Sequence, residues 1–142
     1  MSKIKKTERT MSEIKSYTDI EQSKKLAKIL PIESADMCCF QNPNGSINYY
    51  GFPFLQGNKD SNPIPCWSLA ALLGVLPKDE SIDCSISFGY YNGKGEYIEK
   101  WLCAFEKEGE TTDSFIIETI DGDNPIDACV AMVEKLNELN LL

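Results

Sequence analysis

The feature that most constrains the fold of this chain is the strict alternation of residues 82–90. Apolar side chains at every second position alternate there with polar or small ones. This period of two is typical of a β-strand with one buried face. The Asn-Gly-Lys-Gly sequence at 92–95 then supplies a hairpin turn, and segments 97–106 and 113–120 indicate two further strands. Connections this short predict an antiparallel meander.

Three helices are predicted from apolar residues at helical spacing and from their caps. Thr18 and Glu21 form the pattern of a capping box, and Ser68 is a favourable N-cap. Asn124 followed by Pro125 is a strong signal for the start of the last helix. The predicted helices cover residues 18–30, 69–76 and 124–139.

These elements predict an α+β fold, with a mainly antiparallel sheet of three to four strands and helices packed on one face. A short strand at 35–40 and a brief one at 47–50 are the other β candidates. The 142 residues are enough for one domain, which we place at 17–142. Residues 1–16 have no apolar periodicity and are expected to form a flexible basic arm. The expected core includes Leu72, Leu73, Ile86, Phe88, Val130 and Val133.

Charge and composition exclude several classes of function. The chain has no histidine, which removes the commonest general base and the commonest metal ligand. We therefore expect no enzymatic activity, no cofactor and no metal. The net charge is −8, which disfavours direct binding to nucleic acid and suits a protein partner with a basic surface. Seven acidic residues between positions 106 and 123 form either a solvated face or an acidic docking surface.

Two segments have some features of reactive or metal-binding motifs, and each has a simpler structural interpretation. Cys66 precedes a predicted helix, where a thiolate is favoured, but no histidine exists to activate it, and packing in the core is the preferred interpretation. Residues 121–124 begin like a calcium loop, but Pro125 starts a helix where further ligands would stand. The six cysteines contain no C-x-x-C motif and are expected to be reduced and unbridged.

The candidate partner-binding residues lie in the long connection 41–65, which is rich in proline and glycine. This segment contains four aromatic residues, and aromatic side chains dominate interface hot spots. The alternative is that these side chains cap the core. The candidates are Tyr49, Tyr50, Phe52 and Phe54.

No apolar run is long enough to cross a membrane, and the basic N-terminus lacks the apolar stretch of a secretory signal. The expected location is therefore the cytoplasm, with no membrane association.

Three segments of the chain resemble a family of small proteins of unknown function from gut Bacteroidetes, their prophages and other mobile elements. These segments are YTDIEQSKKL at 17–26, PCWSLAALL at 65–73 and NPIDACV at 124–130. The resemblance implies a mobile-element setting and no defined activity. We therefore expect a non-catalytic accessory or interaction protein of a phage or mobile element. The alternatives are an inhibitor of a host defence protein that acts through its acidic surface, and a small-molecule or peptide-binding domain.

Overall fold

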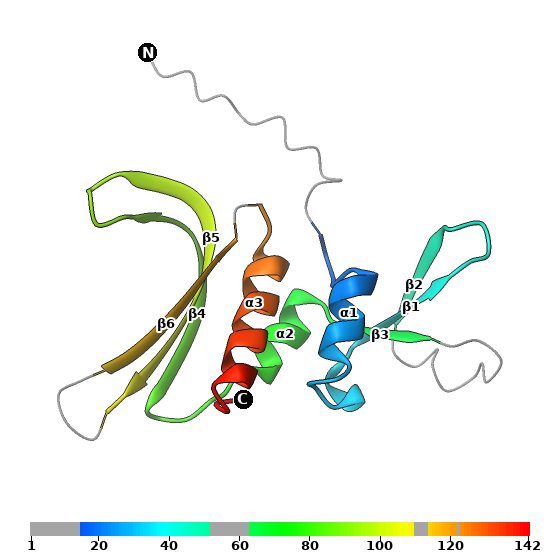
Figure 1. Ribbon diagram of the computed structural model, residues 1–142, viewed down its shortest axis with the longest axis horizontal. Helices are drawn as coiled ribbons and strands as arrows, with labels where there is room; N and C mark the ends of the chain where they lie inside the picture. The colour runs from blue at the N-terminus through cyan, green and yellow to red at the C-terminus, as the bar shows by residue number, and fades with distance from the viewer. Residues whose placement is uncertain (1–14, 52–62, 110–113, 122) are drawn as a thin grey trace, which may run out of the picture.

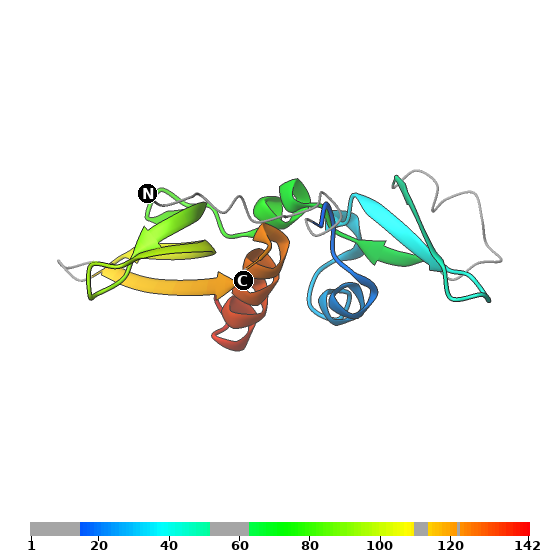
Figure 2. The ribbon, with the colours of Figure 1, turned by 90° about the horizontal axis from the view of Figure 1, so that it is seen from above.

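The computed structural model describes residues 15–51, 63–109, 114–121 and 123–142. Figures 1 and 2 both show two sheets at opposite ends of an elongated molecule, with the helices between them. In chain order the elements are α1 (Ile20–Leu26), the short 3₁₀ helix η2 (Ile32–Ser34), β1 (Met37–Gln41), β2 (Ile47–Gly51), β3 (Ile64–Cys66), α2 (Leu69–Val75), β4 (Ile82–Tyr91), β5 (Tyr97–Glu108), β6 (Ser114–Asp121) and α3 (Pro125–Glu138).

Strands β4, β5 and β6 form the antiparallel meander that the alternation predicts. Ile86 lies opposite Cys103, and Phe105 lies opposite Ile117. These apolar side chains belong to the same core cluster as the buried residues of α3. We call the side of the sheet toward α3 the inner face and the opposite side the outer face.

Helix α3 begins as the sequence predicts. The Asn124 side chain accepts a hydrogen bond from the Ile126 amide at 2.9 Å, and Pro125 occupies the first turn. The Thr119 hydroxyl donates to the Ala128 carbonyl at 2.8 Å and so links β6 to the helix. The buried stripe of α3 then packs on the inner face.

A second antiparallel sheet, in the order β2-β1-β3, lies at the other end of the molecule. The α+β class is confirmed, but the strands are divided between two three-stranded sheets instead of forming one. The segments of β1 and β2 were predicted, whereas β3 was not. The reason is that β3 has only three residues and includes Pro65, which has no N–H to donate to a strand partner.

Helix α1 is shorter than the predicted 18–30, and its cap is different. Asp19 is the N-cap and forms a capping box with Gln22. The hydroxyl of Thr18 is instead buried, where it lies 2.7 Å from the Ser23 hydroxyl and accepts the Trp67 amide at 3.1 Å. The prediction of a Thr18 cap was therefore wrong, because a residue 49 positions away takes up its hydroxyl.

Residues 1–14 of the predicted arm lie outside the described residues. Lys15, at its end, has an ammonium 2.8 Å from Asp127 and 3.1 Å from Asp19. This pair of contacts joins the start of α1 to the first turn of α3.

One buried cluster joins the three helices to the β4-β5-β6 sheet, and it includes Leu26 of α1, Trp67, Leu72 of α2 and Phe105 of β5. The buried cysteines of β1 and β3 are not part of it. Of the predicted core, Leu72, Val130 and Val133 are buried, while Leu73 and Ile86 are half-buried. The prediction for Phe88 was wrong, since this side chain is 41% exposed. Phe88 lies near the end of the β4–β5 hairpin that bends away from α3 in Figure 1, so the helix does not cover it.

Candidate functional site

The structure places two of the four predicted partner-contacting residues on β2. Tyr49 and Tyr50 are neighbours in the strand, so their side chains point to opposite faces. The Tyr49 ring lies 4.1 Å from that of Tyr17, and the Tyr50 ring lies 5.5 Å from that of Phe40. Both tyrosines are half-buried. Phe52 and Phe54 lie outside the described residues.

The thiols near Cys66 are buried and protonated. Cys38, Cys39 and Cys66 have no exposed surface, and all six cysteines of the chain are free. Burial, together with a hydrogen bond to Cys66, raises the pKa of the Cys39 thiol to about 12. Burial also raises the pKa of Cys66, although Ser23 and Cys39 partly oppose this shift. A raised pKa leaves little thiolate at neutral pH, which supports packing over nucleophilic chemistry at Cys66.

Thiol labelling tests this arrangement. We expect Cys84, which is half-buried, to be the first to react with a thiol reagent at pH 8. The five buried cysteines should react at least about tenfold more slowly than free cysteine, because burial blocks access. At Cys38, Cys39 and Cys66 a raised pKa also leaves little of the reactive thiolate. Raising the pH to 9 should not make the Cys39 thiol reactive toward the reagent, since its pKa is about 12.

The control for labelling is Cys84→Ser, which should abolish most of the early reaction. In denaturant, all six thiols should be labelled without reductant. Rapid modification of Cys39 or Cys66 in the folded chain, or fewer than four labelled thiols after unfolding, would contradict the assignment.

The segment that begins like a calcium loop is explained by helix capping. Asn124 caps α3, and position 122 lies outside the described residues. Within the described part of the chain, no group of three or more potential metal ligands comes together.

The outer face of the β4-β5-β6 sheet carries the acidic side chains. Figure 1 shows the helices on the other side of this sheet. Asp83 lies directly opposite Glu106, and Glu118 lies opposite Ala104, with all three carboxylates exposed. We call these three residues the acidic end of the outer face. Like charges directly opposite each other destabilise a sheet, and no ion pair to them is found among the described residues.

Two exposed tyrosines lie at the other end of the same strands. Tyr91 lies opposite Tyr97, and their ring centres are 5.2 Å apart. The two side chains are 74% and 52% exposed. We call them the tyrosine pair. Strand β6 ends opposite Trp101, so only β4 and β5 continue to this end of the sheet.

The tyrosine pair shares the outer face with the acidic end. Two residues of β5 stand against Gly89 alone, so the bulge is in β5 and β4 keeps its alternation. Tyr91 therefore has the orientation of Ser85 and Ser87, which are exposed on the outer face. The Tyr97 ring covers Gly89, where a β-carbon would lie 1.8 Å from the hydroxyl oxygen of Tyr97. The positive φ of 83° at Gly89 also favours glycine at this bulge.

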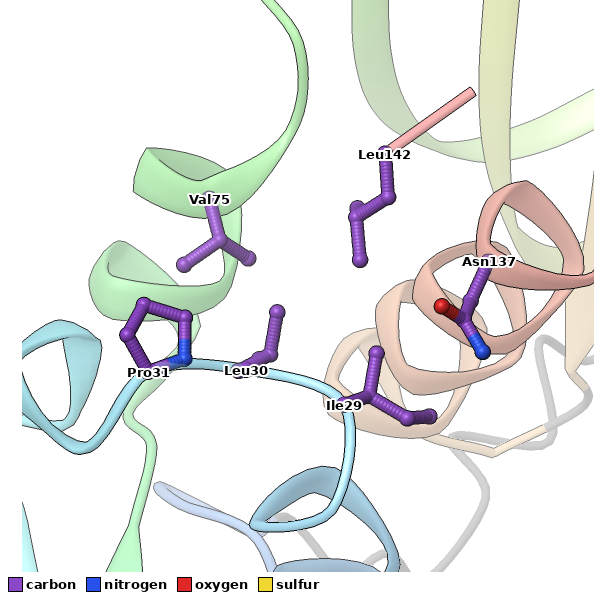
Figure 3. Close-up of a pocket in the computed structure, with 6 residues that line it drawn as sticks. All are labelled: Ile29, Leu30, Pro31, Val75, Asn137 and Leu142. Atoms are coloured by element: carbon purple, nitrogen blue, oxygen red, sulfur yellow. The ribbon is translucent and has the colours of Figure 1, made fainter. Parts of the chain in front are cut away.

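An apolar hollow of about 370 Å³ lies where the segment after α1, helix α2, helix α3 and the C-terminal residue meet (Figure 3). Among the described residues that line it, the only polar side chain is the amide of Asn137 and none is titratable. These residues offer apolar contact but no catalytic group. It is lined by Ile29, Leu30, Pro31, Val75, Asn137 and Leu142.

The tyrosine pair is not among the functional residues predicted from the sequence. The predicted aromatic contacts are those at 49–54, while Tyr97 was predicted as part of a strand. Their pairing could have been predicted from the turn at 92–95, because residues on either side of a short hairpin turn lie opposite each other. Their exposure, however, depends on which side of the sheet the helices cover.

Comparison with protein-family models, with curated proteins and with solved structures finds no match. None of the helices in the described ranges is long and apolar enough to span a bilayer.

Proposed function

We propose that this chain is a non-catalytic interaction protein that binds a protein partner with a basic surface. The observation that carries the proposal is the acidic end of the outer face. There, Asp83 and Glu106 oppose each other on a sheet surface that none of the helices covers. This arrangement costs stability in the free protein, and a basic partner would offset that cost by neutralising both carboxylates.

Two further features support the proposal. The net charge of −8 would steer a basic partner toward the chain from a distance. The chain has no histidine, and its buried thiols have raised pKa values at Cys38, Cys39 and Cys66, which disfavours a catalytic role for them.

The biological setting in this proposal comes from the resemblance of residues 17–26, 65–73 and 124–130. It assigns the chain to a phage or mobile element as an accessory protein. Inhibition of a basic host defence protein is one form that this role would take. A reducing compartment such as the cytoplasm suits its six free thiols.

The test compares two variants with the same net charge. The first neutralises the acidic end by Asp83→Asn, Glu106→Gln and Glu118→Gln. The control neutralises three exposed acids away from the sheet by Glu21→Gln, Glu33→Gln and Glu138→Gln. A partner is captured from a cell lysate with the full chain, purified, and its affinity is then measured for all three proteins at low and moderate salt.

We expect the partner to be basic and its affinity to fall at least about tenfold when the acidic end is neutralised. Moderate salt should also weaken binding, because exposed charges are screened. The control variant should bind within about threefold of the original chain. Equal affinity for the two variants, or binding that is insensitive to salt, would contradict the proposal.

A further inference from the structure

We infer that the partner segment is an extended chain carrying arginine, which lies along the outer face and stacks one guanidinium on the tyrosine pair. A second cationic side chain of the same segment pairs with the acidic end. This inference rests on the proposed function and adds the location, the chemistry and the spacing of the groups that are recognised.

The first step is the distance between the acidic end and the tyrosine pair. Asp83 and Tyr91 lie on the same strand, eight positions apart. Eight residues of antiparallel strand span roughly 27 Å. A partner that reaches both ends with an extended segment therefore needs its cationic groups about eight residues apart.

The second step is the surface between the ends. Ser85 and Ser87 of β4 and Ala104 of β5 have small side chains and lie on the outer face. Small residues let another backbone approach the sheet closely. Leu102, opposite Ser87, is a larger apolar side chain on this surface. No lysine or arginine occurs among residues 83–87 and 102–106, while Lys100 stands beside Glu99 in the bulge opposite Gly89.

The third step is the choice of arginine for the tyrosine end. The guanidinium group is planar, weakly hydrated and stacks on aromatic faces, whereas the lysine ammonium is compact and strongly hydrated. The tilt of 59° between the two rings, together with their high exposure, leaves aromatic surface open to a planar cation.

A second copy of this chain is a poor occupant of the same surface. Two copies packed through their outer faces would bring the carboxylates of the acidic end close to those of the partner copy. The resulting repulsion disfavours that dimer and leaves a basic partner as the occupant.

The experiment uses synthetic peptides in place of the unidentified partner. The matched peptide carries two arginine pairs separated by about seven neutral residues, and the short peptide has the same composition with a spacer of about two. A third peptide replaces the arginine pair at one end with lysine. Affinities are measured calorimetrically for the full chain, Tyr91→Ala, Tyr91→Phe and Ile32→Ala.

Ile32→Ala is the matched control because Ile32 is 51% exposed and lies in η2, away from this sheet. Tyr91→Phe keeps the ring and should bind like the original chain. Circular dichroism of Tyr91→Ala confirms that the fold is retained, as expected for a side chain that is 74% exposed.

We expect the matched peptide to bind about tenfold more tightly than the short peptide, because both ends are engaged at once. Tyr91→Ala should weaken the matched peptide about three- to fivefold and leave the short peptide unchanged. Replacing arginine by lysine at one end should have an effect of similar size.

Other outcomes overturn the inference and can be told apart from failure of the proposed function. If the original chain and Tyr91→Ala bind the matched peptide equally well, the tyrosine pair does not contribute to binding. The proposed function would then still be tested by the affinity of the captured partner for the charge variants. The same holds if none of the peptides binds. A dimer in sedimentation that Tyr91→Ala dissociates would assign this face to a second copy instead.

Discussion

Replacement of Trp67 by Ala should lower the free energy of unfolding by about 3–5 kcal/mol, one of the two largest losses we expect for a single substitution in this chain. Trp67 is completely buried between the second sheet and α2. Its indole N–H donates to the Ser34 hydroxyl at 2.9 Å, while its backbone N–H and carbonyl both bond to Thr18. Removal of the ring leaves a cavity and takes away the hydrogen bond that the Ser34 hydroxyl accepts, although this hydroxyl still donates to the Pro31 carbonyl.

Urea denaturation followed by circular dichroism measures this loss. The matched substitution Trp67→Phe keeps an aromatic ring but removes the indole N–H, so its loss should be smaller, about 1–3 kcal/mol. A loss below about 1 kcal/mol for Trp67→Ala would show that the site collapses around the missing side chain and that Trp67 does not organise this part of the core.

The substitution Phe105→Ala should cost a similar amount, about 3–5 kcal/mol, at the other end of the molecule. Phe105 is 1% exposed on the inner face and lies between its neighbours Cys84 and Ile117 under α3. Because Phe105 and Trp67 belong to the same buried cluster, we expect this loss to be transmitted to the packing around Trp67.

A fluorescence measurement tests that coupling. The chain has two tryptophans, so Trp101→Phe leaves Trp67 as the only reporter, far from Phe105 in the sequence. In this background, Phe105→Ala should shift the unfolding midpoint seen by Trp67 and the midpoint seen by circular dichroism by the same amount. An unchanged Trp67 transition would instead divide residues 17–142 into two independently unfolding units.

Some features of the candidate site could be predicted from the local sequence, whereas others depend on contacts between distant segments. The alternation of residues 82–90 predicts that Asp83 lies on the face opposite Ile86, so the acidic character of the outer face could be foreseen. The pairing of Asp83 with Glu106 depends on the register of the hairpin, and a shift of one residue would reverse the faces. The tyrosine pair is exposed because it lies on the outer face, on the side of the sheet away from the helices. Which side the helices cover is decided by the packing of the whole chain.

The meander and α3 follow from local sequence patterns. In both, each signal acts within a few residues: alternation along β4, the turn at 92–95, and the cap and proline at Asn124 and Pro125. The second sheet, the cap of α1 and the exposure of Phe88 follow only from the packing of the folded chain. Each of these depends on a contact between distant segments, such as the bond between Thr18 and Trp67, or on where a covering element stops. Periodicity encodes which face of an element is apolar, but the partner that buries this face is chosen only when the whole chain packs.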